Sequence, residues 1–273
     1  MKFRTEIEPM GPREPITHDD RIVMLGSCFT DSVGGLLARD GFNVTANPLG
    51  VLYNPLSIAQ VVQRAMVGAP YTIDDLTERD GVWHCLELES RRQDTDPQRL
   101  LDSLNGDLQA FANNLRQATV WIITFGTSWV FELDGQVVGN CHKLDSRLFD
   151  RRRLDIDEIT AAWQPVIGGR RVIFTVSPIR HLADGLHGNQ LSKATLLLTI
   201  DRMGAEYFPA YEILNDDLRD YRFYAADLKH PSPMAVDYVY EVFEKTYFTA
   251  ETRQRALLAR QQAARAAHRP IIK

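Results

Sequence analysis

Ser27 is placed where a strand-to-helix turn could present a nucleophile. It follows a short apolar run and a glycine, in RIVMLGSC, and a helical pattern begins a few residues later. The start of a helix offers free N–H groups and a positive dipole, which can stabilise the oxyanion formed when a nucleophile attacks a carbonyl. Taken alone, a serine at such a turn is more often a small structural residue.

A matching base occurs near the other end of the chain. His230 follows Asp227 by three residues in DLKHPSP. One helical turn would bring these side chains together, and Asp227 would then orient the imidazole and stabilise its protonated form. Pro231 also restricts His230 to an extended backbone. The alternative is an exposed Asp/His pair in a loop without a catalytic role.

The elements that must position these residues follow an α/β pattern. Short apolar runs predict buried strands at 21–28, 42–46, 120–125, 171–176 and within 205–214. Helical patterns lie between and after them, at 31–39, 57–66, 97–117, 154–163, 189–203 and 233–247. This alternation predicts a three-layer α/β/α fold with a mainly parallel five-stranded sheet. A strand at 82–88 and a hairpin at 129–140, which turns at Asp134-Gly135, are predicted insertions.

Composition excludes several classes of protein. The chain has 273 residues, of which 44% are hydrophobic and 25% charged, so it is globular. A net charge of −5 argues against a protein built to bind nucleic acid, and no apolar run is long enough to span a membrane. The N-terminus shows no export signal, and the three cysteines lie far apart without metal-ligand spacing. These features predict a reduced, cytoplasmic protein with neither metal nor organic cofactor.

Further motifs carry a resemblance to a known family. The segment GSCFT at 26–30 is similar to the motif that names the GSCFA family, with Thr in place of Ala. Six more blocks follow in the family's order: NPLGVLYNP (47–55), TFGTSW (124–129), NCHK (140–143), VSPIRH (176–181), YFPAYEI (207–213) and DDLRDYRFYAADLKHPS (216–232). The resemblance covers most of the chain from 21 to about 247. The GSCFA family is in turn grouped with SGNH (GDSL-like) hydrolases.

The resemblance implies a flavodoxin-like fold and a set of site residues. Ser27 resembles the SGNH nucleophile, Asp227 and His230 resemble the DxxH pair, and Gly50 resembles an oxyanion-binding glycine. The segment from Gly126 to Ser128 resembles the third SGNH block, except that Ser128 stands where those enzymes have asparagine. The N–H groups of Ser27 and Gly50 are therefore expected to hold the oxyanion. A third donor is expected from Ser128, Asn140 or His142.

Two neighbouring features complete the expected site. Arg180 and His181 follow a strand end and are expected to bind an anionic group of the substrate, although a structural role is the alternative. Cys28 is expected to be a buried structural thiol on the other side of the turn from Ser27.

The expected function is a serine-dependent acyl-ester hydrolase or O-acyltransferase of SGNH type. Its expected substrate is a small-molecule ester, with an acylated carbohydrate as one candidate. The alternative is a binding module that kept the fold and lost turnover. The expected organisation is an extension at 1–20, the main domain at 21–249 and an Arg-rich helical tail at 250–273. That tail is expected to be a solvated helix, with a partner or polyanion contact as the alternative.

Overall fold

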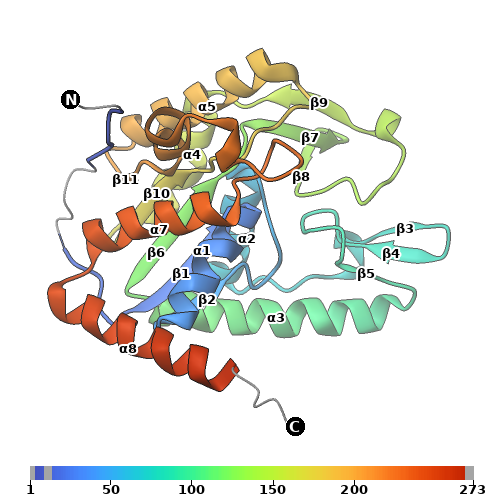
Figure 1. Cartoon of the computed structure of the whole chain (residues 1–273). Helices are drawn as coiled ribbons and strands as arrows, with labels where there is room; N and C mark the ends of the chain where they lie inside the picture. The colour runs from blue at the N-terminus through green and yellow to red at the C-terminus, as the bar shows by residue number, and fades with distance from the viewer. Residues whose placement is uncertain (1–3, 9–13, 268–273) are drawn as a thin grey trace, which may run out of the picture.

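A five-stranded sheet forms the centre of the computed structural model, which describes residues 4–8 and 14–267 (Figure 1). Every neighbouring pair of its strands is parallel. In spatial order they are β2 (Asn43–Ala46), β1 (Arg21–Gly26), β6 (Val120–Phe125), β10 (Val172–Val176) and β11 (Glu206–Phe208). The predicted α/β fold with a parallel sheet is confirmed. The last strand lies within its predicted range of 205–214, and it ends at Phe208 because the chain turns there into the short helix α6 (Ala210–Glu212) and a π-helix at 213–218.

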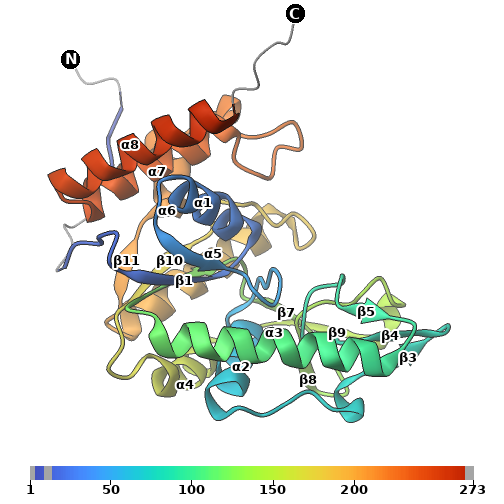
Figure 2. The ribbon, with the colours of Figure 1, turned by 90° about the horizontal axis from the view of Figure 1, so that it is seen from below.

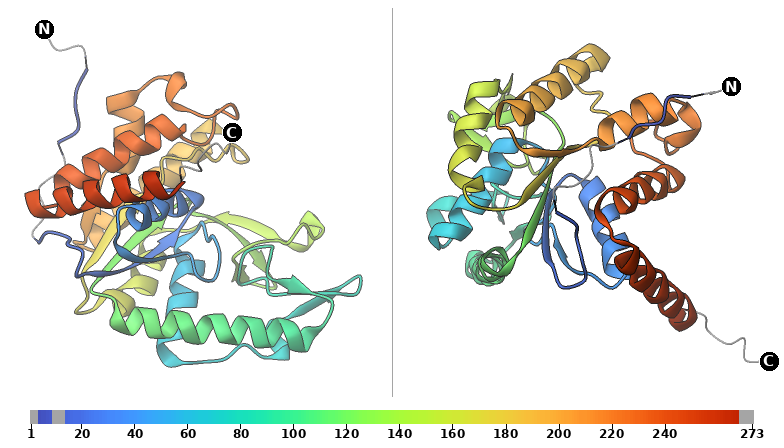
Figure 3. Two further views of the ribbon diagram at one scale, coloured as in Figure 1. Left: turned by 60° about the horizontal axis from the view of Figure 1, so that its bottom comes forward. Right: turned by 90° about the vertical axis from the view of Figure 1, so that its left-hand side faces the viewer.

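Helices cover both faces of the sheet. Side chains alternate along each strand, so that Met24 and Ile122 face one layer while Val23 and Ile123 face the other. The first layer contains α1 (Cys28–Arg39), α7 (Pro233–Tyr247) and α8 (Ala250–Ala267). The second contains α2 (Pro55–Val67), α3 (Pro97–Gln117), α4 (Ile156–Ile167) and α5 (Gly185–Arg202). Figures 2 and 3 show the two helical layers on opposite sides of the strands.

The strand order determines where a ligand site can form. Numbered along the chain, the five strands lie in the order 2-1-3-4-5, which is the flavodoxin-like arrangement. The chain leaves β1 toward one edge of the sheet and leaves β6 toward the other. The loops that follow β1 and β6 therefore diverge and leave a crevice at the carboxyl ends of these strands.

Two small antiparallel sheets project beside this crevice (Figure 1). One contains β3 (Thr77–Arg79), β4 (Val82–His84) and β5 (Gln93–Asp94). The other contains β7 (Trp129–Leu133), β8 (Gln136–Val138) and β9 (Asp150–Arg153). The predicted hairpin is confirmed, and Asp134 and Gly135 both have positive φ, as its two-residue turn requires. Strand β9 was not predicted, since its sequence DRRR has no apolar alternation.

Both ends of the described chain pack against the main domain. The N–H of Ile16, a fully buried residue, donates to the Tyr247 carbonyl at 2.8 Å. In α8, Arg260 forms an ion pair with the fully buried Asp40, at 2.8 and 2.5 Å. Parts of the predicted extension (1–3 and 9–13) and the end of the predicted tail (268–273) lie outside the described residues. Among the helices that the structure describes, none combines the length and apolar composition needed to cross a bilayer.

Candidate active site

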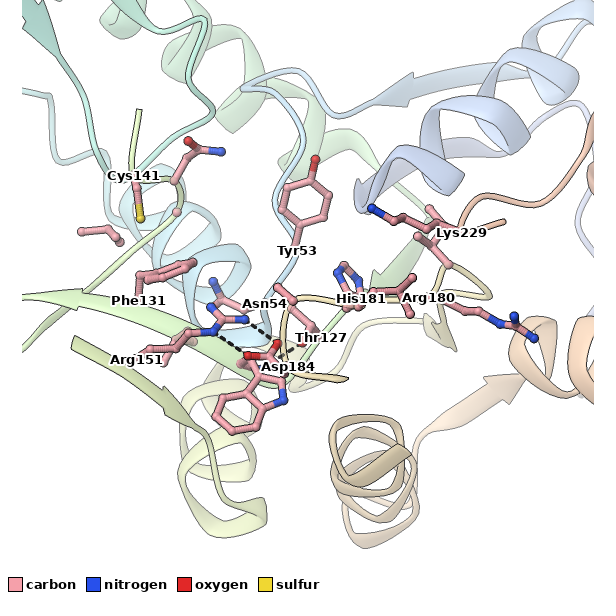
Figure 4. A pocket seen from close by; sticks show the side chains of 18 of the residues that line it. Tyr53, Asn54, Thr127, Phe131, Cys141, Arg151, Arg180, His181, Asp184 and Lys229 are labelled. Atoms are coloured by element: carbon pink, nitrogen blue, oxygen red, sulfur yellow. Dashed lines mark hydrogen bonds and ion pairs between the residues drawn. The ribbon is translucent and has the colours of Figure 1, made fainter. Parts of the chain in front are cut away.

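A pocket of about 540 Å³ opens at the carboxyl ends of the central strands (Figure 4). Its walls come from the start of α1, the loop before α2, the β7–β8–β9 sheet and the loops that follow β10 and precede α7. Figure 4 shows Cys141 and Phe131 toward one end and Arg180 and Lys229 toward the other, with Tyr53 between them. The pocket therefore lies at the switch point of the sheet, where doubly wound folds bind ligands.

The loop before α7 holds an Asp–His pair at this pocket. His230 Nδ1 lies 2.6 Å from Asp227 Oδ2, while Asp227 Oδ1 accepts the N–H groups of Lys229 and His230 at 2.9 and 3.0 Å. The hydrogen bond from His230 and these two backbone donors hold the pKa of Asp227 far below its usual value. Asp227 is thus a carboxylate that fixes the ring. Because His230 lines the pocket, its Nε2 is the nitrogen available for proton transfer.

Ser27 lies beneath the pocket wall. Its side chain is fully buried, and its Oγ donates to Ser177 Oγ at 3.0 Å. Ser27 is the N-cap residue of α1 with an extended backbone, but its side chain makes no capping hydrogen bond. The serine hydroxyl therefore links the end of β1 to the residue after β10, and it is directed at Ser177.

Cys28 occupies the position expected for Ser27. It is the first residue of α1, it is partly exposed, and it lines the same pocket as His230. Burial raises the pKa of its thiol, the N–H groups of Cys28 and Phe29 oppose this shift, and the charges of Asp31 and Asp227 add to it. The prediction that Cys28 points away from the site is wrong. Ser27 turns inward to Ser177, so the next residue, which starts the helix, faces the pocket.

The expected oxyanion glycine, Gly50, is not free to donate in this structure. Its N–H already donates to the Asn47 carbonyl at 2.9 Å, and it lines a separate small cavity beneath the sheet end. Gly50 has φ of +99°, and Glu89 packs so closely that an added Cβ would lie 2.2 Å from the Glu89 Cγ. The glycine is needed here for the turn and for this close approach.

The segment after β6 is also engaged elsewhere. The N–H of Gly126 donates to the Tyr53 carbonyl at 2.8 Å. Ser128 is fully buried, with its N–H donating to Ser192 Oγ at 2.7 Å and its Oγ donating to the Ser192 carbonyl at 3.4 Å. Ser128 therefore binds α5 and does not line the pocket, and Thr127 is the residue of this segment that does.

Of the other two expected donors, only Asn140 reaches the pocket. His142 is buried, with Nδ1 3.3 Å from His84 Nδ1 and Nε2 3.1 Å from the Leu88 carbonyl. Burial lowers the pKa of both histidines. His142 thus joins the loop after β8 to the inserted segment that follows β4. The Oδ1 of Asn140 accepts the His142 N–H at 2.9 Å, which leaves the amide nitrogen of Asn140 as its donor.

Arg180 and His181 both line the pocket, and they differ in charge. The Arg180 guanidinium lies 4.0 Å from the centre of the Tyr224 ring, and Figure 4 shows it turned away from Tyr53 and His181. Burial, reinforced by the charge of Lys193, lowers the pKa of His181 to about 3. His181 therefore brings no charge to the expected anion site, and the role of Arg180 in it stays a prediction. His181 Nε2 is buried and finds no hydrogen-bond partner within 4–8 and 14–267, so the ring is available as a neutral donor or acceptor.

A buried lysine next to the site was not predicted from the sequence. Lys193 of α5 is 1% exposed, and its Nζ donates to the carbonyls of Gly126 and Ser177 at 2.6 and 2.8 Å. Burial lowers its pKa to about 7. No local signal in the sequence indicates this burial, because only the structure shows that Lys193 shares a buried face of α5 with the polar residues Asn189 and Ser192.

An ion pair at the end of the pocket near Phe131 was also not predicted from the sequence. Arg151 of β9 binds Asp184 through two hydrogen bonds of 2.7 and 2.6 Å, and its guanidinium lies 4.2 Å from the centre of the Phe131 ring (Figure 4). Its strand gave no periodic signal, so the sequence offered no reason to place Arg151 here.

Together these features define a three-layer α/β protein with an Asp–His pair at the switch point of a parallel sheet. The chain belongs to the GSCFA family, whose family model matches residues 21–243. No curated protein and no solved structure matches the chain.

Proposed function

We propose that the protein is an acyl-ester hydrolase or O-acyltransferase of SGNH type. The observation that carries this proposal is the pairing of His230 Nδ1 with Asp227 at 2.6 Å, on the wall of a pocket of about 540 Å³. An imidazole held in this way by a carboxylate is arranged to accept a proton at Nε2. The similarity of the Asp227–His230 segment to the SGNH DxxH pair supports the same chemistry.

The proposed reaction uses a nucleophile from the junction of β1 and α1. His230 removes its proton as it attacks the ester carbonyl, and the imidazolium then gives that proton to the leaving alkoxide. The N–H groups of Cys28 and Phe29, the first two of α1, lie at this junction and favour negative charge there. The amide of Asn140 is a further donor on the pocket wall. Water then releases the acyl group, or a sugar hydroxyl takes it.

The pocket composition supports a substrate with both apolar and polar parts. Trp129 and Phe131 offer aromatic surface, and Arg151, which is held by Asp184, adds a fixed polar group. Such a mixture suits an acylated carbohydrate better than a long lipid chain.

A second candidate function is a binding module that retains this pocket without turnover. The observation in its favour is the burial of Ser27, whose hydroxyl donates to Ser177. In addition, Gly50 is not available as an oxyanion donor.

The two candidates are separated by assaying the purified protein with 4-nitrophenyl acetate and with acetylated monosaccharides. If the protein is an enzyme, His230→Ala should lower kcat by about 10²–10⁴-fold. His187→Ala, which changes an exposed histidine of α5, is the matched control and should leave kcat unchanged. Saturable sugar-ester binding without turnover would support the binding module, and equal activity of the two variants would contradict a base role for His230.

A further inference from the structure

We propose that the nucleophile of this site is the Cys28 thiol and that Ser27 is a positioning residue. This inference rests on the proposed acyl-transfer function and specifies its reacting atom. Cys28 lines the pocket together with His230, whereas Ser27 is fully buried beneath it. A nucleophile must reach the substrate, and of these two neighbours only Cys28 does so.

The hydrogen bonds of Ser27 support this assignment. An activated serine would donate its proton to the base, but Ser27 Oγ donates to Ser177 Oγ at 3.0 Å. Ser177 Oγ also accepts the N–H of Ile179 at 3.3 Å, and the Ser177 carbonyl accepts Lys193. Ser27 is therefore part of a buried network that joins the ends of β1 and β10, directly below the pocket floor.

The surroundings of Cys28 are those of a thiol that needs a base. Burial raises the pKa of the Cys28 thiol, so the group is protonated at neutral pH until a base removes the proton. His230 is the histidine paired with a carboxylate on the same pocket wall. Cys28 and His230 line the same pocket, so the thiol and the Asp–His pair open onto one space. The N–H groups of Cys28 and Phe29, at the start of the twelve-residue helix α1, favour the thiolate once it forms.

The other pocket cysteine provides a comparison within the same molecule. Cys141 is also partly exposed and also lines the pocket, but burial raises its pKa to about 11. The neighbouring His142 cannot serve it as a base, because both ring nitrogens face His84 and the Leu88 carbonyl. Exposure alone therefore does not distinguish Cys28 from Cys141. The difference is the base: Cys141 lies at the end of the pocket away from Lys229, the neighbour of His230 in the chain (Figure 4).

The proposed step balances without a redox partner. The Cys28 S–H proton moves to His230 Nε2 as sulfur forms a bond to the ester carbonyl carbon. The tetrahedral intermediate collapses, the carbon–oxygen bond to the alcohol breaks, and the alkoxide takes the proton from His230. The resulting thioester is attacked by water or by an acceptor hydroxyl, which passes its proton to His230 and then to the departing thiolate.

The first experiment measures alkylation by iodoacetamide at each cysteine, by peptide mass spectrometry, in the wild-type protein. Cys28 should react at least roughly tenfold faster than Cys141, and His230→Ala should remove this advantage while His187→Ala should not. Equal rates at the two cysteines, or a Cys28 rate that His230→Ala does not change, would overturn the proposal. This measurement requires no substrate, so it tests whether His230 activates the Cys28 thiol even if the protein turns over no ester.

The second experiment compares turnover and acyl adducts for Cys28→Ala, Ser27→Ala and Cys141→Ala. Turnover should fall by about 10³-fold or more in Cys28→Ala and by less than about tenfold in the other two variants. The trapped acyl group should lie on the Cys28 peptide and should be released by neutral hydroxylamine, as expected of a thioester. An acyl group on Ser27, with turnover retained in Cys28→Ala, would overturn the cysteine assignment and leave the proposed function standing. Absence of turnover in the wild-type protein would instead contradict the proposed function.

Discussion

The Nζ atom of Lys193 lies 2.6 Å from the carbonyl oxygen of Gly126, deep inside the protein. The same Nζ donates to Ser177, so one side chain of α5 holds the ends of β6 and β10 together. Lys193 has no carboxylate within ion-pair distance among the residues that the structure describes. A buried charge without a counterion is costly, so the neutral amine is favoured in the folded protein.

This environment predicts a pH-dependent contribution of Lys193 to stability. Its pKa is about 7 in the folded protein against an ordinary value of 10.5, so between these values the unfolded chain binds a proton that the folded chain does not. Stability therefore rises with pH over this range, by up to about 1.4 kcal/mol per pH unit. Urea unfolding of the wild type and of Lys193→Met at pH 7 and pH 9 measures this effect. From pH 7 to pH 9 the free energy of unfolding should rise more in the wild type than in the variant. A difference that stays constant with pH would show that Lys193 does not lose its proton on folding.

The Asp227 carboxylate should be required for turnover and not for folding. Asp227→Asn keeps the shape but removes the charge that stabilises the His230 imidazolium, so kcat should fall by about 10²–10⁴-fold with little change in KM. Asp220→Asn is the matched control, because Asp220 lies in the same loop and contacts Arg222 instead of a histidine. Comparable losses in the two variants would show that the loop's structure, and not the Asp–His pair, is needed.

The His84–His142 contact should make the inserted segments sensitive to acid. Burial lowers the pKa of both rings below the ordinary value of 6.5, so protonation favours the unfolded chain. The stability that the neutral pair provides is present above pH 6.5 and is lost as pH falls below it. His142→Ala should lower the free energy of unfolding by about 1–3 kcal/mol at pH 7.5. The variant should also lose less of its stability than the wild type does between pH 7.5 and pH 5. Urea unfolding at both pH values checks this, and an unchanged decline would contradict it.

The Arg-rich helix α8 should stabilise the fold through a single arginine. Arg260 pairs with the fully buried Asp40, which also accepts the hydroxyl of Tyr240 at 2.7 Å. Arg260→Ala should lower the free energy of unfolding by about 2–3 kcal/mol. Breaking a buried ion pair typically costs about 3–5 kcal/mol, and the loss is smaller here because Arg39 still contacts Asp40. Arg255→Ala, at an exposed position of the same helix, should change the free energy of unfolding by less than about 0.5 kcal/mol. Equal effects would mean that α8 contributes through its general charge.

Much of the fold could be predicted because its signals are local. Buried parallel strands are continuous apolar runs, and 120–125 was placed at its observed bounds for that reason. Helix α7 was equally clear, since Ser232 caps it and Pro233 occupies its first position. The three-residue spacing of Asp227 and His230 likewise predicted their contact, although a non-helical turn with Leu228 at φ +57° forms it in place of the expected helical turn. Strand β9 has no such signal, since it exists only through its pairing with β7.

The sequence located the turn at Gly26-Ser27-Cys28, but only the tertiary structure decided which of the adjacent residues Ser27 and Cys28 lines the pocket. Adjacent residues at a strand-to-helix turn point to different sides, and local propensity does not distinguish the sides. Ser27 points inward because Ser177, which lies 150 residues away, accepts its hydrogen bond across the parallel sheet. Cys28 lines the same pocket as His230 because β1 and the loop before α7 meet at the same end of the sheet. That pairing of distant strands, driven by burial of their apolar side chains, determines the direction of each side chain at the site.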